Sequence, residues 1–248
     1  MPRGINMYDE ARLQNRNSAS SNSINIVSPG FITDGLILHV DAANYMSYPK
    51  SGTTVYNLVG TDRGTFVADV AFQEQNGGSF IFDGSGDYLD FASSNITTYT
   101  KEATFLGWIY RNGAQVNTAT ILMYNRNTGV NFFGTTNNLA YHWGVQTTFS
   151  FNSGLQPPSL AWSMYAVSVS PSRTKIYLCQ SSGITSSTYT FTHNAVNVGG
   201  LRIGHFGSNY PADRFFKGNI AITAVYNRSL SEEEITQNFN ATRHRFNI

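Results

Sequence analysis

Short hydrophobic runs separated by small polar clusters dominate the chain from residue 35 onward. The runs are rich in β-branched and aromatic residues, and clusters of Gly, Asn, Asp and Ser interrupt them about every eight to twelve residues. The run that begins at Met164 has a period of two, because Tyr165, Val167 and Val169 fall on one face of an extended chain. This pattern predicts an all-β domain in which antiparallel strands form a sandwich or a barrel.

The predicted strands follow these runs, and turn-forming pairs such as Asn112-Gly113 lie where the chain is expected to reverse. The strands are expected at Leu36–Val40, Ser79–Phe82, Tyr88–Phe91, Ala103–Tyr110, Thr120–Tyr124, Val130–Phe133, Leu139–Trp143, Met164–Val169, Lys175–Cys179, Leu201–Ile203 and Ile220–Tyr226.

Residues 231–243 have the pattern of a helix rather than a strand. Ser231 followed three residues later by Glu234 forms a capping-box sequence, and acidic residues in a first turn suit the helix dipole. Ile235 and Phe239 give an apolar stripe at i, i+4. We therefore expect about three helical turns packed on the edge of the sandwich.

The first 32 residues differ in composition from the rest of the chain. They include a low-complexity stretch, Asn15–Ser23, which is too polar to bury much apolar surface. Tyr8 and Leu13 are the apolar positions of a short amphipathic piece that a partner surface would cover. We expect an N-terminal docking arm at residues 1–32 and a single domain at residues 33–248.

Composition limits the classes of partner. Charged residues make up 12% of the 248 positions, against a usual value of about 25%, and the formal net charge is +1. Such a chain provides no field to attract nucleic acid or anionic lipid, so neither is an expected partner. The single cysteine, Cys179, excludes an intramolecular disulfide.

Four stretches in this order resemble the laminin-G-like, concanavalin-A-like jelly-roll domains of bacteriophage virion structural proteins. They are GLILHVDAANYMSYPKSGTTVYNLVG, GGSFIFDGSGDYLDF, ATFLGWIY and FFKGNIAITAVYNRSLSEEEITQNFNATRHRF. The resemblance extends from Thr33 to about Phe246, and the last stretch is the most specific. The arm sequence MPRGINMYDEARLQNR also resembles the leader of some phage virion proteins.

This resemblance implies a two-sheet antiparallel jelly roll with a virion location, assembled in the host cytoplasm. Capsid decoration or another particle-surface role is one implied function, with the arm attaching the domain to other capsid or tail proteins and the domain forming a homo-oligomer. The alternative is a lectin-like module of a fibre or receptor-binding protein that binds a host surface glycan. The same architecture carries lectins, glucanases and inert structural domains.

The residues give no sign of catalysis. A retaining glycoside hydrolase on this fold needs two carboxyl groups about 5 to 5.5 Å apart, which a strand provides from acidic residues at i and i+2. No predicted strand carries such a pair, and no Gly-x-Ser-x-Gly sequence surrounds a serine. We therefore expect a protein without enzymatic activity and without catalytic residues.

Calcium is the cofactor that the resemblance makes worth testing, because laminin-G-like domains can hold one Ca²⁺ at a sandwich rim. Asp83, Asp87 and Asp90 lie within one turn and the strand after it, and hard oxygen ligands suit this ion. The alternative is an ordinary turn in which Asp87 caps backbone amides.

Aromatic residues in loops and at strand ends are candidate platforms for a sugar. Sugar C–H faces stack on aromatic rings while the hydroxyl groups form hydrogen bonds to nearby polar side chains. The candidates lie beside Asn, Ser and Gly, and loops of this kind often carry function. They are Tyr45, Tyr48, Trp143, Phe206 and Tyr210. The alternative is that these rings fill the ends of the sandwich core.

Overall fold

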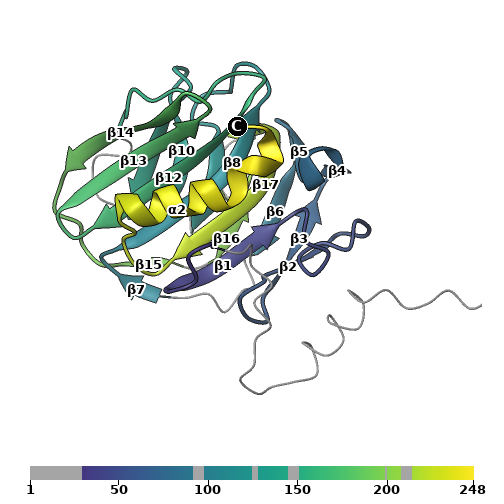
Figure 1. The fold of residues 1–248 in the computed structure, drawn as a ribbon, viewed down its shortest axis with the longest axis horizontal. Coiled ribbons are helices and arrows are strands. Elements are labelled where there is room, and N and C mark those ends of the chain that lie inside the picture. The colour runs from purple at the N-terminus through teal and green to yellow at the C-terminus, as the bar shows by residue number, and fades with distance from the viewer. Residues whose placement is uncertain (1–29, 92–97, 125–127, 145–150, 199, 208–213) are drawn as a thin grey trace, which may run out of the picture.

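Two antiparallel sheets stack face to face, and one helix crosses the outer face of the larger sheet (Figure 1). The computed structural model describes residues 30–91, 98–124, 128–144, 151–198, 200–207 and 214–248. Within these residues the named strands pair antiparallel in both sheets. The structure confirms the predicted all-β, two-sheet jelly-roll sandwich.

Sheet A is the larger sheet and has the order β14-β13-β12-β8-β17-β5-β4. β1 pairs with β17 over the part of that strand that β5 leaves unpaired. The strands of sheet A are β1 (Leu36–Asp41), β4 (Ala71–Gln73), β5 (Ser79–Asp83), β8 (Ala103–Arg111), β12 (Trp162–Ser170), β13 (Arg173–Gln180), β14 (Gly183–Thr190) and β17 (Lys217–Tyr226).

Sheet B has the order β11-β10-β9-β16-β6-β3-β2. Its strands are β2 (Thr54–Tyr56), β3 (Arg63–Val67), β6 (Tyr88–Phe91), β9 (Thr120–Tyr124), β10 (Thr128–Phe133), β11 (Asn138–Trp143) and β16 (Leu201–Ile203). A small separate sheet joins β7 (Thr98–Thr100) to β15 (Val196–Val198), and a 3-10 turn, η1 (Gln75–Gly77), precedes β5.

The central strands of sheet A, β8, β12 and β17, are buried on both of their faces. In β8, Phe105 and Ile109 belong to the core between the sheets, whereas Leu106 and Trp108 belong to a second apolar cluster on the outer side. This arrangement follows from the sequence ATFLGWIY, in which both alternating sets of positions are mostly apolar. The outer face therefore needs a cover to exclude water.

The helix α2 (Glu232–Thr242) and the 3-10 turn η2 (Arg243–Phe246) provide this cover. The indole of Trp108 stacks on Phe246 at 4.1 Å between ring centroids and on Phe239 at 5.6 Å. Its Nε1 donates a hydrogen bond of 2.8 Å to Oγ1 of Thr242. The buried indole N–H is thus satisfied inside the apolar cluster, as the stability of such a group requires.

The predicted capping box is confirmed. Oγ of Ser231 accepts a hydrogen bond from the backbone N–H of Glu234, and a carboxylate oxygen of Glu234 accepts one from the N–H of Ser231. Ile235 and Phe239 are buried as expected. The regular helix ends at Thr242, one residue before the predicted end. No helix in the described part of the chain is both long and apolar enough to span a bilayer.

Each predicted strand is present, with ends that differ by a few residues. The structure adds strands that the pattern did not predict, namely β2, β3, β4, β7, β14 and β15. These are short or lie at sheet edges, and β14 has the sequence GITSSTYT. Edge positions exposed on both sides need no apolar alternation, so the hydrophobic pattern gave no signal for them.

The segment before β1 is part of the packed domain. The Phe31 side chain is buried and its ring stacks on His39 at 4.8 Å. The N–H of Ile32 donates to Oδ1 of Asn238, and the hydroxyl of Tyr226 donates to the carbonyl of Ile32. The domain boundary expected at residue 33 is therefore too late, because this segment is fixed against α2 and β17. The arm anchors, Tyr8 and Leu13, lie outside the described residues.

We expect Phe239→Ala to lower the free energy of unfolding by about 3–5 kcal/mol, the usual loss for a buried aromatic side chain. The variant removes the ring between α2 and Trp108, which the rest of the helix cannot replace. Chemical denaturation measures the change, and Asn240→Ala, at the exposed neighbouring position, is the matched control. Equal stability of the two variants would show that the helix is peripheral to the domain.

Candidate functional site

The outer face of sheet B carries polar and aromatic side chains rather than an apolar cluster. On β6, Leu89 and Phe91 belong to the core between the sheets. Tyr88 and Asp90 alternate with them and therefore face outward, where both are partly exposed. β3 shows the same alternation of buried and exposed positions, whereas β9, β10 and β11 are buried at almost every position. The part of the outer face formed by β6 and its neighbours is therefore the part of sheet B that a ligand can reach.

β16 adds a cation beside these two residues. Arg202 lies opposite Asp90 in the register of β6 and β16. The Arg202 guanidinium forms an ion pair with Oδ2 of Asp90, with N–O distances of 3.1 and 3.2 Å. The same guanidinium lies 4.8 Å from the ring centroid of Tyr88. Strand pairing thus places an aromatic ring, a carboxylate and a guanidinium together.

His205 and Phe215 complete this group, which we call the outer cluster (Tyr88, Asp90, Arg202, His205 and Phe215). The His205 ring stacks on Phe215 at 4.2 Å and lies 5.3 Å from Tyr88. Burial, and secondarily the positive charge of Arg202, lower the pKa of His205 to about 4. The imidazole is therefore neutral at pH 7.

The tautomer of His205 follows from its contacts. Nδ1 accepts a hydrogen bond of 3.4 Å from the backbone N–H of Gly207, so the proton of the neutral ring is on Nε2. In the described part of the chain, Nε2 has no hydrogen-bond partner. A buried donor without a partner is uncommon in native proteins, although the ring nitrogens of the buried His39 share this feature among the described residues.

A second aromatic group lies on the same face. The ring of Phe206 contacts His142 edge to face at 5.4 Å, and the Arg214 guanidinium lies 4.5 Å from its centroid. Burial, with a smaller effect of Arg214, lowers the pKa of His142 to about 4. Phe206 is only 4% exposed. It therefore supports Arg214 and His142 and does not present the open platform that the sequence predicts.

Two of the other predicted sugar platforms are buried in the core. Tyr48 packs against Phe66 and Phe80 with ring-centroid distances of 5.5 and 5.3 Å. Trp143 is 4% exposed, and its Nε1 donates to the carbonyl of Asn194. The prediction of exposed platforms at Tyr48 and Trp143 is wrong, because both rings fill the ends of the space between the sheets.

The remaining two candidates give no site. Tyr45 is partly exposed and lies outside the outer cluster. Tyr210 lies outside the described residues, so the structure does not place its ring.

The three aspartates proposed for calcium do not form a metal site. The Asp87 carboxylate accepts backbone N–H bonds from Asp69 and Asp83, and burial raises its pKa despite these bonds. Asp83 is exposed and accepts from the N–H of Ser85, whereas Asp90 is paired with a guanidinium on the outer face. The described residues contain no group of three or more His, Cys, Asp or Glu that could hold a metal ion. The alternative prediction, a turn capped by Asp87, describes this segment.

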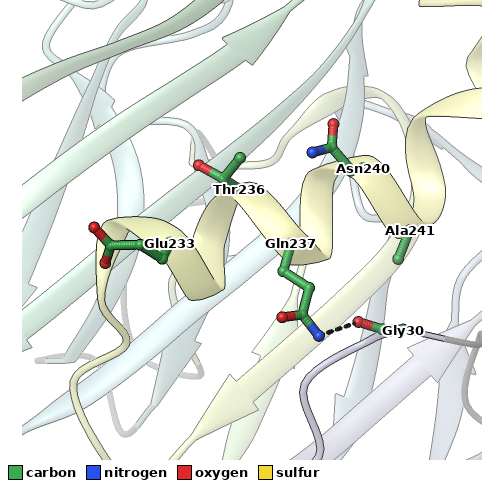
Figure 2. Close-up of a pocket in the computed structure, with 6 residues that line it drawn as sticks. All are labelled: Gly30, Glu233, Thr236, Gln237, Asn240 and Ala241. Carbon is green, nitrogen blue, oxygen red and sulfur yellow. Dashed lines mark hydrogen bonds between the residues drawn. The ribbon is translucent and has the colours of Figure 1, made fainter.

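A shallow pocket of about 460 Å³ lies on the opposite side of the molecule (Figure 2). Gln237 donates to the carbonyl of Gly30 across it, at 2.7 Å. Its lining residues lie on one face of α2 and on the segment before β1: Gly30, Glu233, Thr236, Gln237, Asn240 and Ala241. The lining contains no aromatic ring and no cation. The outer cluster is therefore the stronger candidate for ligand binding.

The two stacked sheets, with a packed interior and one polar outer face, define a jelly-roll domain of the lectin type. The model of the concanavalin A-like lectin/glucanases superfamily matches residues 83–236 of the chain. The chain belongs to this superfamily. A comparison with curated protein sequences finds no significant match.

Solved structures share the fold at low sequence identity. Domain 4 of an extracellular arabinanase from Geobacillus stearothermophilus, in complex with arabinotriose, is 16% identical with a TM-score of 0.56, covering 84% of this chain and 98% of that one. A Trypanosoma rangeli sialidase in complex with sialic acid is 12% identical with a TM-score of 0.60 and 96% coverage of this chain. The match spans only 38% of the sialidase.

A third similar structure is a putative carbohydrate binding protein from Bacteroides ovatus. It is 14% identical with a TM-score of 0.51, and the match covers 64% of this chain and 46% of that one. At such identities these likenesses establish the fold and do not transfer a ligand.

Sequence reasoning missed most of the outer cluster. Tyr88, Arg202, His205 and Phe215 were not proposed as ligand-binding residues, although Asp90 was singled out for a different role. The period of two in β6 and β16 is the signal that identifies Tyr88 and Arg202 as outward-facing. The pairing of these two strands, which are far apart in the sequence, carries no local signal.

We expect the free energy of unfolding to fall as the pH decreases from about 6.5 to about 4. Burial lowers the pKa values of His39, His142 and His205 to about 4. In the unfolded chain, the pKa of a histidine side chain is about 6.5. The unfolded state binds more protons between these values, so the stabilisation is complete above pH ~6.5 and is lost on acidification. Chemical denaturation at a series of pH values measures this loss.

His205→Phe should make this pH dependence shallower, because the replacement ring can stack on Phe215 and does not titrate. His244→Gln, at an exposed position, is the matched control. An unchanged slope in His205→Phe would mean that His205 is solvated rather than buried.

Proposed function

We propose that the domain is a non-catalytic carbohydrate-binding module whose ligand lies on the outer face of sheet B, against the outer cluster. The observation that carries the proposal is the partly exposed ring of Tyr88, whose centroid lies 4.8 Å from the Arg202 guanidinium and 5.3 Å from the His205 ring. An aromatic ring beside planar polar groups is the chemistry that a sugar requires. The C–H face stacks on the ring, and the hydroxyl groups exchange hydrogen bonds with the polar groups.

The ion pair between Arg202 and Asp90 supports this function by fixing both side chains before a ligand arrives. The guanidinium side chain is 14% exposed and the carboxylate side chain is 20% exposed, so each is held mostly inside the surface. Side chains that are already immobilised lose little conformational entropy on binding. The neutral His205 packs against Tyr88 without adding a charge.

The similar structures support carbohydrate as the ligand class. Among them are a domain in complex with arabinotriose and a putative carbohydrate binding protein. They are distant relatives by sequence, so the sugar itself is left to experiment. Arabinotriose and sialic acid are the first probes, followed by an array of bacterial and host glycans.

The positions of the carboxylates favour binding over hydrolysis. A glycosidase of the common kind uses two carboxyl groups that face one substrate. Asp90 is engaged by Arg202, and both oxygens of Asp87 accept backbone N–H groups in the turn before β6. Neither side chain is arranged as the free nucleophile or the general acid of such a pair, and this supports the proposal of binding without hydrolysis.

We expect Tyr88→Ala to weaken glycan binding by about tenfold or more, because a central aromatic anchor usually carries a large share of binding energy. Calorimetric titration with the best glycan of the array measures the affinity. The glycan should be recovered unchanged after long incubation.

Tyr99→Ala is the matched control, since Tyr99 is 73% exposed on β7 and lies outside the outer cluster. It should bind as the wild type does. Equal affinity of the Tyr88 and Tyr99 variants, or no glycan bound by the wild type, would contradict this function.

A virion structural role is the second candidate, and the fixed segment before β1 favours it. Phe31, Ile32 and the Gly30 carbonyl are held by the domain. Gly30, the first described residue, is therefore held at a defined point beside α2. A polar segment attached at such a point suits a docking arm that carries the domain on a larger assembly.

Deleting residues 1–29 should leave a domain with wild-type thermal stability that no longer copurifies with virus particles in a density gradient. Tyr88→Ala in the full chain should copurify normally, because the arm and not the outer cluster makes this attachment. Wild-type occupancy by the truncated domain would contradict the docking role of the arm.

A further inference from the structure

The strand β14 forms a long open edge of sheet A (Figure 1). All eight of its residues pair with β13, from Gly183 opposite Gln180 to Thr190 opposite Arg173, without a register shift. In a regular antiparallel pair, half of the backbone N–H and C=O groups on each strand point away from the partner. No described residue bonds to this outer side of β14.

The other edges of the two sheets are short or covered. β2 and β4 have three residues each. On β1, Asn57 accepts from the N–H of His39 and donates to the Ile37 carbonyl, and the N–H of Leu58 donates to the His39 carbonyl. On β11, the N–H of Leu139 donates to the carbonyl of Leu155. On β11 these contacts involve Leu139 alone, so β14, with eight residues, is the longest edge strand to whose outer side no described residue bonds.

β14 also lacks the features by which proteins prevent unwanted edge pairing. Its sequence, GITSSTYT, contains no charged residue and no proline, and the strand has no bulge. Natural edge strands usually carry at least one of these features. A regular, uncharged strand of eight residues can therefore accept another strand.

The composition of β14 fits an identical strand as the partner. Thr185, Ser186, Ser187 and Thr188 are four consecutive hydroxyl residues, so an antiparallel copy places hydroxyl groups opposite hydroxyl groups. Ser and Thr pairs of this kind stabilise adjacent strands. Because the strand is uncharged, two copies bring no like charges together.

Aromatic surface lies beside the same edge. The Tyr189 ring stacks on Phe151 at 4.7 Å and on Phe191 at 5.7 Å, and all three rings are partly exposed. Partly exposed aromatic rings are enriched in protein interfaces. They supply apolar contact area that backbone pairing alone would lack.

We propose that β14 pairs antiparallel with β14 of a second copy of this chain, so that the two larger sheets become one continuous sheet. The two-fold axis is perpendicular to the sheet, since only this axis keeps α2 of both copies on the same side. Residues that lie opposite each other on two paired strands have their side chains on the same face of the sheet. The two-fold axis therefore pairs one residue of β14 with the same residue of the second copy. If the strands overlap fully, this residue is Ser186 or Ser187, at the centre of β14. The proposal is independent of glycan binding.

Sedimentation velocity of the full chain over a range of concentrations tests the pairing. We expect a monomer–dimer equilibrium with a Kd in the micromolar range, because an edge pairing is a small interface. Ser186→Lys should raise this Kd by about tenfold or more, since each dimer then holds two lysines near its axis. Ser186 is exposed, so the variant should fold, and Asn240→Lys adds the same charge on α2 as the control.

Cysteine crosslinking tests the geometry independently. The native Cys179 is buried and does not interfere. Under mild oxidation, either Ser186→Cys or Ser187→Cys should give a disulfide-linked dimer, according to which residue faces itself, whereas Asn240→Cys should not. A wild-type chain that stays monomeric, a dimer that Ser186→Lys leaves unchanged, or a dimer that neither cysteine crosslinks would overturn the proposal.

Discussion

Burial of both faces of sheet A is the constraint on which the rest of the structure depends. The inner face packs against sheet B, and the outer face presents Trp108 and its apolar neighbours, which would be unstable in water. The chain meets this requirement with α2, whose Phe239 stacks on the indole while Thr242 accepts its N–H. The turn at Ser231 sets the direction in which α2 crosses sheet A. The complete capping box fixes the start of the helix at this turn.

Because the helix covers sheet A, the proposed ligand site falls on sheet B. No described helix covers the outer face of this sheet, and β6 and β16 alternate buried apolar residues with partly exposed polar or aromatic residues. The outer cluster depends on this alternation and on the adjacency of β6 and β16. The histidines there are neutral because burial opposes their protonation. The charges on this part of the face are therefore those of the Arg202–Asp90 pair and of Arg214, and the two histidines add none.

The sequence predicts an element well where burial of that element leaves a pattern of apolar residues within the element itself. β8 and β17 were identified as long runs of apolar and β-branched residues, β12 by its period of two, and the helix by its cap and its apolar stripe. β14 was missed because a strand exposed at an edge needs neither period nor apolar residues.

The candidate site was less predictable because it depends on contacts between distant segments. Loop position suggested that Tyr48 and Trp143 were exposed, yet the open ends of a sandwich also need large rings to exclude water, and these two residues fill them. Tyr88 and Arg202 are recognisable as outward-facing, but only the strand order shows that they meet.

The position of β17 in sheet A affects how the protein folds during synthesis. This strand comes late in the chain yet lies between β8 on one side and β1 with β5 on the other, so Leu36 pairs with Tyr226. Contacts between such distant residues slow folding, because a long loop must close before they form. Until Tyr226 leaves the ribosome, β1, β5 and β8 have no common partner, and their apolar faces stay exposed. During this interval the exposed strands can associate with other chains, so late completion of sheet A makes aggregation the main competitor of folding.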